Sequence, residues 1–488
     1  MPVVFRHSAF RLCFGKAADF LFSGDMNMNL SKFVGDRDFY RRLFAVMIPV
    51  LIQNVVTNFV SLLDNIMVGQ IGTEPMSAVA IVNQLIFVFN LCIFGGTAGA
   101  GILAAQFYGK GDHEGVRATF RMKLIISTVT LLVAFGIFLG MGDRLIELFL
   151  HEGNEGLDLA ITFDHAREYM AIMLWQLTPF AILSIYAITL RETGETVLPM
   201  KASVTAVLVN LVFNYLLIFG KFGFPELGVR GAAIATVIAR FVELLIVVIW
   251  THRNRQRNVF IVGVYRSMRV PLPIVKQVLL MGAPLLLNEL LWSSGMTTLN
   301  QCYSLRGLEV VSALNISTMA SNLFFCAFFA MGSTVSIMVG QLLGAGKLEQ
   351  AVDEDRKLIA FAVALCAVVG VVMAILSPFI PNIYNTIDTV KRIAVSLLLV
   401  TSAMMPLNAF NNCCYFTLRS GGKTIITLIF DSAFVWLISI PVAFVLSRFT
   451  ELPILEMYII IQALELIKSS VGFYMVKKKM WVRNLVTE

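Results

Sequence analysis

The most constraining feature of this chain is a series of twelve apolar stretches, each long enough to cross a lipid bilayer. An α-helix rises about 1.5 Å per residue, so about 20 apolar residues cross roughly 30 Å of hydrocarbon. Because backbone polar groups find no water there, each stretch must satisfy them internally as a helix. The spans are predicted at 43–68, 76–107, 117–141, 166–190, 197–220, 228–251, 275–302, 309–343, 357–377, 391–418, 423–446 and 453–476. The sequence therefore predicts an all-α polytopic membrane protein.

Composition supports the same class and argues against a soluble one. Hydrophobic residues make up 58% of the chain and charged residues 14%, whereas a soluble domain has about 25% charged residues. The net charge of +7 would suggest nucleic acid in a soluble protein. Here the basic residues lie at the ends of the apolar stretches, where they anchor and orient helices. We therefore expect the lipid bilayer as a partner and no nucleic acid.

The distribution of Lys and Arg predicts the orientation of the spans. The N-terminal tail, the loops after each even-numbered span and the C-terminal tail hold most of the 38 Lys and Arg residues. By the positive-inside rule these regions are cytoplasmic, in a multi-pass protein of the plasma membrane. This assigns 1–42 and 477–488 to cytoplasmic tails and 252–274 to a basic cytoplasmic linker.

The first 25 residues have a separate interpretation. They carry basic residues but no apolar run long enough for a signal peptide. They are expected to be a disordered tail or the product of a start codon placed too early, with Met26 and Met28 as alternative starts.

The two halves of the chain repeat each other. At an offset of 235, one set recurs in type: Pro49, Asn65, Gly72, Gln106 and Gly109 match Pro284, Asn300, Gly307, Gln341 and Gly344. At an offset of 228, a second set recurs: Thr189, Leu190, Arg191, Gly194 and Thr196 match Thr417, Leu418, Arg419, Gly422 and Thr424. Six spans per half insert both halves the same way up, as parallel repeats. We expect an N-lobe at 43–251, a C-lobe at 275–476 and a substrate cavity between them.

Polar residues within the N-lobe spans predict an ion site. Asn54, Thr57, Ser61 and Asp64 recur at helical spacing on one face of the first span. A charge in the hydrocarbon costs about 2.5 to 3.5 kcal/mol on insertion scales, so Asp64 needs a function or a partner. With Asn210, Asn214 and Thr236 of the fifth and sixth spans, it offers an all-oxygen set suited to a hard cation, or a carboxylate that exchanges protons. Ordinary interhelical hydrogen bonding is the alternative for the amides and the hydroxyl.

The C-lobe carries a different polar set. Its cavity candidates are Glu289, Asn408, Asn412 and Asp431. Glu289 occupies the repeat position of Asn54, whereas the counterpart of Asp64 is Leu299, so the lobes share a scaffold and not a site. Structural roles remain open for Glu289 and Asp431. Two local ion pairs are also expected, Arg240 with Glu243 and Glu465 with Lys468, each at a spacing of i, i+3.

Catalytic chemistry is not indicated. The seven Cys and five His form no pattern with metal-ligand spacing. We therefore expect no enzyme activity, no cofactor and no metal beyond a possible sodium ion at Asp64.

Several motifs resemble one known family from about Phe39 onward. They are LLDNIMVGQIG with Asp64, AAQFYGKGD at 104–112, LRETGET at 190–196, the NLVFNYLL run from Asn210, VGQLLGAGK at 339–347 and LRSGGKT at 418–424. Together they resemble the multidrug and toxic compound extrusion (MATE) transporters. The resemblance implies an antiporter that exports cationic amphipathic organic compounds in exchange for sodium ions or protons, by alternating access. It also implies a cation site at Asp64, Asn210, Asn214 and Thr236.

The C-lobe departs from the sodium-coupled bacterial branch of that family. The branch has acids at positions that align with Trp292 and Asn408, neither acidic here, and Glu289 is one turn from the first. The coupling ion therefore stays open between sodium and protons. The chain is expected to work as a monomer.

Three other functions fit the residues less well. A flippase of lipid-linked oligosaccharide or peptidoglycan precursors would need several buried bases to hold a pyrophosphate, and the only candidates for this role are Arg240 and Lys468. A transporter of the other large twelve-helix superfamily would carry a GxxxDRxGRR-like loop after its second span, which GKGDHEGVRA is not. A membrane enzyme or receptor would need clustered catalytic groups or a soluble domain.

Overall fold

The computed structural model describes residues 32–150, 158–384 and 386–487. Within them, twelve helices are long and apolar enough to cross a membrane, and no strand is present. The N-terminal expectations for residues 1–25 lie outside the described part. The prediction of an all-α polytopic protein with twelve spans is confirmed.

The helices match the predicted spans closely. They are α2 (Arg37–Gly69), α3 (Thr73–Lys110), α4 (His113–Glu147), α5 (Leu159–Glu192), α6 (Val197–Phe219), α7 (Gly228–Arg253), α8 (Leu272–Ser304), α9 (Leu308–Gly344), α10 (Leu348–Leu376), α11 (Asp388–Ser420), α12 (Thr424–Leu428), α13 (Ile440–Phe449) and α14 (Ile454–Lys477). The eleventh span, Thr424–Phe449, combines α12 and α13 with two intervening π-helical turns, Ile429–Ala433 and Val435–Ser439. Such turns are rare and often occur at functional or strained positions.

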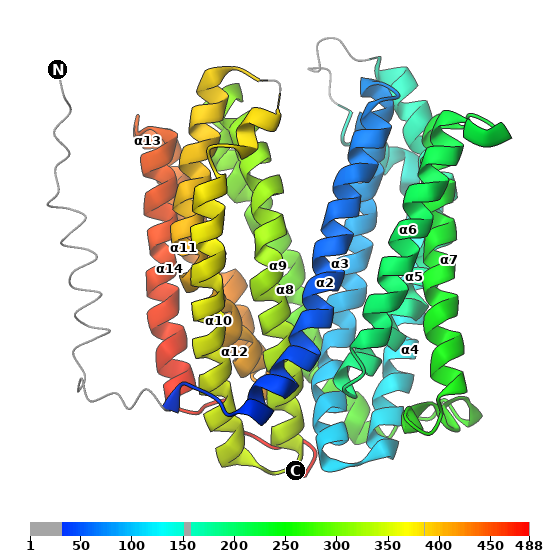
Figure 1. The fold of residues 1–488 in the computed structure, drawn as a ribbon, viewed down its shortest axis with the longest axis vertical. Coiled ribbons are helices and arrows are strands. Elements are labelled where there is room, and N and C mark those ends of the chain that lie inside the picture. Colours follow the sequence, from blue (N-terminus) through cyan, green and yellow to red (C-terminus); the bar gives the residue numbers. More distant parts are fainter. Residues whose placement is uncertain (1–31, 151–157, 385, 488) are drawn as a thin grey trace, which may run out of the picture.

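The helices form two lobes (Figure 1). The N-lobe contains α2 to α7 and the C-lobe α8 to α14, and α2, α3, α8 and α9 lie in the middle of the molecule. Helix α2 begins at the lower end in Figure 1, and the C-terminal segment lies at the same end. Because both tails are predicted to be cytoplasmic, this end is the predicted cytoplasmic side.

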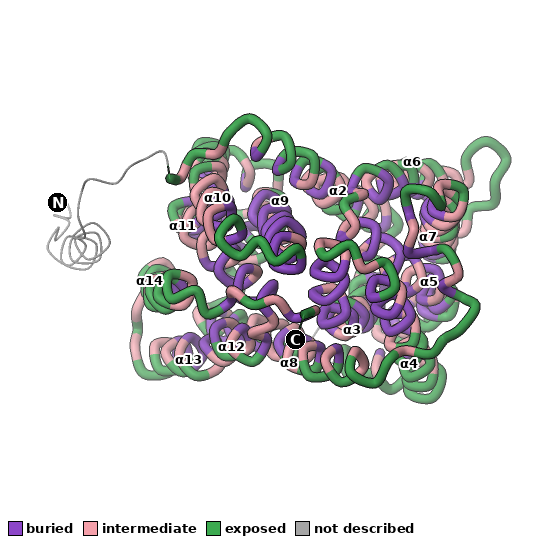
Figure 2. The backbone as a smooth tube through the Cα atoms, turned by 90° about the horizontal axis from the view of Figure 1, so that it is seen from below, coloured by how far each residue is buried: buried purple, intermediate pink, exposed green. Residues whose placement is uncertain are grey.

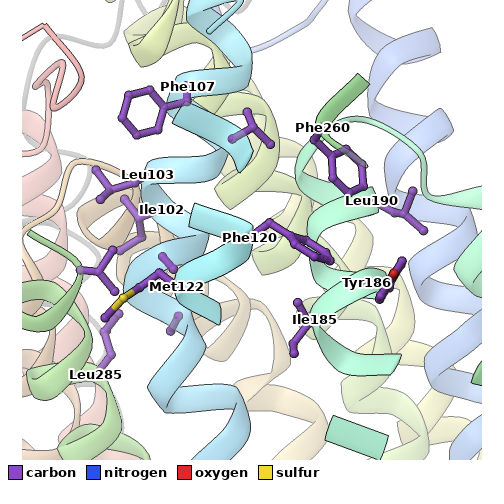
Figure 3. Close-up of a cluster of buried hydrophobic side chains, with 14 of the residues drawn as sticks. Ile102, Leu103, Phe107, Phe120, Met122, Ile185, Tyr186, Leu190, Phe260 and Leu285 are labelled. Carbon is purple, nitrogen blue, oxygen red and sulfur yellow. The ribbon is translucent and has the colours of Figure 1, made fainter. Parts of the chain in front are cut away.

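The first helix of each lobe packs against both lobes. Near its start, Leu43 of α2 packs in one buried cluster with Val335 of α9 and Leu358 of α10, whereas Val68 near its end packs in an N-lobe cluster. In α8 the arrangement is mirrored, because Leu285 packs against N-lobe residues such as Met122 (Figure 3) and Tyr303 packs within the C-lobe.

A proline lies inside each of these crossing helices, Pro49 in α2 and Pro284 in α8. Proline removes a backbone hydrogen bond within a helix and allows it to bend. Contacts with the opposite lobe lie on both sides of each proline, because Leu43 and Val50 of α2 pack with C-lobe residues and Val278 and Leu285 of α8 pack with N-lobe residues.

Glycines bring α3 and α9 into close contact at the predicted cytoplasmic side. A Cβ at Gly109 would overlap the backbone of Gln341, and a Cβ at Gly344 would overlap the backbone of Gln106. The Gln341 amide also donates to the Glu192 carbonyl of α5 at 2.9 Å, and the Gln106 amide to the Ser420 carbonyl of α11 at 2.9 Å. The lobes are therefore closed against each other at this side. The glycine and glutamine contacts that close them come from equivalent positions of the internal repeat.

Candidate functional site

The N-lobe cluster brings together all four residues that the sequence predicted. Asp64 comes from α2, Asn210 and Asn214 from α6, and Thr236 from α7. The Asn214 amide donates to Asp64 Oδ1 at 2.6 Å and lies 3.2 Å from Asn210 Oδ1. Asn210 and Thr236 are 3.3 Å apart, side chain to side chain. The two asparagines lie one turn apart on α6, so both amides face the same carboxylate.

The Asn210 amide has two possible orientations. In one, its nitrogen donates to Thr236 and its oxygen faces Asn214. In the other, its nitrogen donates to Asp64 Oδ1 at 2.8 Å and Oδ2 at 3.2 Å, and its oxygen accepts from the Thr236 hydroxyl. An amide carries both a donor and an acceptor, so this site can present either N–H groups to a carboxylate or oxygens to a cation.

The cluster contains a buried oxygen atom that has no hydrogen-bond donor in the part of the chain that the structure describes. Asn210 and Asn214 are 5% and 2% exposed, whereas Asp64 and Thr236 are half-buried. The Asn214 Oδ1 atom is buried and has no hydrogen-bond partner among the described residues. Asp64 likewise has no ion-pair partner within the described part of the chain. A carboxylate and a free amide oxygen are ligands that a hard cation prefers, and the carboxylate can bind a proton instead.

The rest of the predicted stripe on α2 is less buried. Asn54 is half-buried, whereas Thr57 and Ser61 are exposed and the Ser61 hydroxyl donates to the Thr57 carbonyl at 3.0 Å. The ion cluster is thus confined to the Asp64 end of the stripe.

In the C-lobe, Asp431 belongs to a network that includes a base. Lys468 Nζ of α14 lies 2.8 Å from Asp431 Oδ1 and 3.8 Å from Glu465 Oε2. The Asn288 amide of α8 donates to Asp431 Oδ2 at 3.2 Å. Asn411 of α11 donates to Glu465 at 2.9 Å, which extends the network to a fourth membrane-spanning helix.

The repeat relates one contact of this network to the N-lobe. Asn288 and Asp431 stand at the repeat positions of Gln53 and Ser203. The Gln53 amide donates to the Ser203 hydroxyl at 3.2 Å, as Asn288 does to Asp431. The scaffold contact is shared, but only the C-lobe version contains a charge.

The other C-lobe candidates do not join this network. Glu289 lies against Gly95 of α3, where a glycine Cβ would be 3.2 Å from its Cγ. Asn412 Oδ1 is buried without a hydrogen-bond partner among the described residues and lies against Gly332 of α9. Asn408 is half-buried in α11. The cavity roles of all four candidates, Asp431 included, stay predictions.

Both expected local ion pairs are present, but only in the Arg240–Glu243 pair is the local partner the nearest acid to the base. Arg240 and Glu243 are 2.9 Å apart. Lys468 also approaches Glu465, but its shorter contact is with Asp431, which sequence reasoning did not connect to it. Sequence reasoning also missed Asn288, for which the repeat position at Gln53 was the available signal.

The fold and the two polar clusters define a multi-pass membrane protein with intramembrane polar sites, as expected of a transporter. The MatE family model matches the chain twice, at 49–216 and 284–445, and together these matches cover more than half of it. The chain therefore belongs to the MatE family of multidrug efflux transporters, and is a transporter rather than an enzyme.

Relatives and solved structures agree. The chain is 25% identical over 425 residues to the probable multidrug resistance protein NorM of Thermotoga maritima, covering 86% of this chain and 88% of that protein. It is 26% identical over 369 residues to the multidrug resistance protein MdtK of Pectobacterium atrosepticum, covering 74% and 78%.

The fold is similar to an outward-facing multidrug resistance MATE family transporter, with a TM-score of 0.81, 20% identity, and 93% and 98% of the two chains covered. It is also similar to a Vibrio cholerae MATE transporter, VcmN, with a TM-score of 0.81, 17% identity, and 92% and 99% covered.

Proposed function

We propose that this protein is a secondary active antiporter that exports cationic amphipathic organic compounds in exchange for sodium ions or protons. Family membership supports export of small organic compounds, because the relatives above are described as multidrug resistance proteins. In this proposal the protein works as a monomer in the cytoplasmic membrane, with both termini in the cytoplasm.

The observation that carries the proposal is the Asp64 cluster. Its carboxylate is held by an amide and has no ion-pair partner among the described residues. A buried acid without a base can gain a cation or a proton without breaking an ion pair, so its occupancy is free to change during a transport cycle. Asp64, Asn210, Asn214 and Thr236 are therefore the proposed coupling site.

The side-chain amides of Asn210 and Asn214 can change orientation when a cation or a proton binds to Asp64. When Asp64 is charged and free, both asparagines are stabilised with N–H groups toward it; when a cation binds, an amide oxygen is favoured instead. Because the four residues come from α2, α6 and α7, a change of amide orientation alters contacts between three helices.

Alternating access requires that one side of the protein be closed while the other opens. The lobes meet at the predicted cytoplasmic side through Gln106 and Gln341. A similar structure is described as outward-facing, which agrees with closure at that side. Ion binding shifts the equilibrium between the inward-open and outward-open states only to the extent that the ion binds one state more tightly than the other.

The flippase alternative is not favoured. A pyrophosphate needs free cationic groups, and the two intramembrane bases that the sequence offered are engaged with acids. Arg240 pairs with Glu243, and Lys468 pairs with Asp431.

The test is transport by the purified protein in proteoliposomes. A sodium gradient and a proton gradient are imposed in separate experiments. A fluorescent organic cation should move against its own gradient only when the gradient of the coupling ion is present. Movement of a lipid-linked pyrophosphate with no gradient-driven movement of the cation would favour the flippase and contradict the proposal.

A further inference from the structure

The C-terminal segment after α14 lies beneath both lobes instead of extending away from the protein. In Figure 2, which shows the predicted cytoplasmic side, the C-terminus lies between α3, α8 and α9. Trp481 is 1% exposed and Leu485 is 5% exposed. A solvated basic tail would not bury its two largest apolar side chains, so the segment is part of the packed structure.

The first part of the segment is anchored in the C-lobe. Trp481 packs in a buried cluster with Leu343 of α9 and Leu418 of α11. Gly421, just after α11, allows this approach because a Cβ there would overlap the backbone carbonyl of Trp481. The Asn484 amide donates to the Gly344 carbonyl at 3.3 Å, which ties the segment to the end of α9.

The second part of the segment is held by the N-lobe. The backbone N–H of Leu485 donates to Gln106 Oε1 at 2.8 Å, and Gln106 is fully buried in α3. Lys110 Nζ, one turn further along α3, donates to the Val486 carbonyl at 2.9 Å. Leu485 itself belongs to the buried cluster that contains Phe107 of α3. Several contacts therefore connect the segment to a single N-lobe helix, among them a further bond from the Gln106 amide to the Arg483 carbonyl at 3.4 Å.

Gln106 connects this segment to the closure of the lobes. Its amide nitrogen donates to Ser420 of the C-lobe, and its amide oxygen accepts from Leu485. Its repeat mate Gln341 makes the equivalent interlobe bond to Glu192. When the lobes separate at this side, the segment must release either Gln106 and Lys110 or its anchor at Trp481.

We propose that residues 480–486 form a latch that stabilises the lobes in the state closed at the predicted cytoplasmic side. The latch rests on the proposed alternating access, and it sets how often the protein opens to load substrate. Burial of a leucine side chain, with the bonds at Gln106 and Lys110, is large enough to change the ratio of closed to open protein about tenfold.

Distance measurements between the lobes test the latch in the full-length protein. Spin labels on His113 and Lys347, with the native cysteines replaced, report the separation, because these exposed residues stand at the same end of the two lobes. Leu485→Ser removes the buried apolar side chain of the segment and keeps the Trp481 anchor, and a second variant that ends at Lys479 also removes the bonds to Gln106 and Lys110. Thr487→Ala is the matched control, since Thr487 is exposed on the same segment.

In both latch variants the population with a long interlobe distance should rise about tenfold over wild type, while Thr487→Ala matches wild type. Distributions equal to wild type in both variants, with wild type still opening when an organic cation is added, would overturn the latch and leave the proposed function intact. A wild-type protein that opens under no combination of ions and substrate would instead contradict alternating access, and the latch with it.

Discussion

The two lobes share a helical scaffold, but the half-buried acid in the polar cluster of each lobe has a different kind of partner. Asp64 in the N-lobe is held by the Asn214 amide, whereas Asp431 in the C-lobe is held by Lys468. The repeat positions of Asn288 and Asp431 are the neutral Gln53 and Ser203, so the charged network was built onto a contact that both lobes possess. One scaffold therefore supports both an acid that can change its charge and an acid locked in an ion pair.

In the proposed function, the difference assigns ion coupling to the N-lobe cluster and a structural role to the C-lobe network. Protonating Asp431 or binding a cation to it would break its pair with Lys468, and a buried charge left alone is strongly destabilising. At Asp64 the same event breaks no ion pair with a described residue. We therefore expect variants of the C-lobe network to change stability most and variants of the N-lobe cluster to change transport most.

The largest expected effect on stability is at Lys468. Lys468→Met leaves Asp431 and Glu465 without their shared base, and should lower the free energy of unfolding by about 3–5 kcal/mol. Reversible denaturation in mixed micelles measures this change. The N-lobe control is Arg230→Met, which should cost much less because both side chains of its pair with Glu168 are exposed. Equal losses in the two lobes would contradict the distinction, and Lys468→Met combined with Asp431→Leu should recover part of the loss.

A smaller effect is expected where the two lobes share a contact. Asn288→Ala removes an amide that bonds to Asp431 and to the Ser432 hydroxyl, so it should cost about 1.5–3 kcal/mol of unfolding free energy. Ser203→Ala cuts the equivalent N-lobe contact to Gln53. Both partners there are neutral, and the loss should be about 1 kcal/mol. The same denaturation measurement compares them, and a larger loss at Ser203 would show that the charged network does not stabilise its lobe.

The smallest stability effect is expected at Asp64 itself. Asp64→Asn keeps the size of the side chain and removes a charge that has no ion-pair partner among the described residues. Its unfolding free energy should lie within about 0.5 kcal/mol of wild type or rise slightly. A loss above about 2 kcal/mol in the denaturation measurement would show that the charge supports the fold.

Sequence alone predicted the spans and the N-lobe cluster because each depends on local spacing. Length and apolarity define a span, and Asn210 and Asn214 share a helix face at a spacing of four. The contact between Lys468 and Asp431 joins two helices, so it depends on how each rotates about its axis, which spacing within either helix does not specify. The π-helical turns around Asp431 change that rotation further.

The packing of the C-terminal segment could not be predicted for a related reason. Lys477, Lys478 and Lys479 identify a basic tail, but this composition does not show that the apolar side chains after it pack against the lobes. The Trp481 side chain is buried in a cluster with Leu343 and Leu418, and the Leu485 side chain in a cluster with Phe107, and the folded chain brings these residues together. No pattern within the segment itself specifies those partners.

The most direct test of the account is gradient-driven export by Asp64→Asn in proteoliposomes, measured with a fluorescent organic cation under a sodium and then a proton gradient. Asp38→Asn serves as control, because it removes an exposed acid from the same helix. We predict that export by Asp64→Asn falls to background under both gradients, while Asp38→Asn matches wild type and both proteins fold normally. Wild-type export rates from Asp64→Asn under either gradient would contradict the claim that the N-lobe cluster couples transport to the ion.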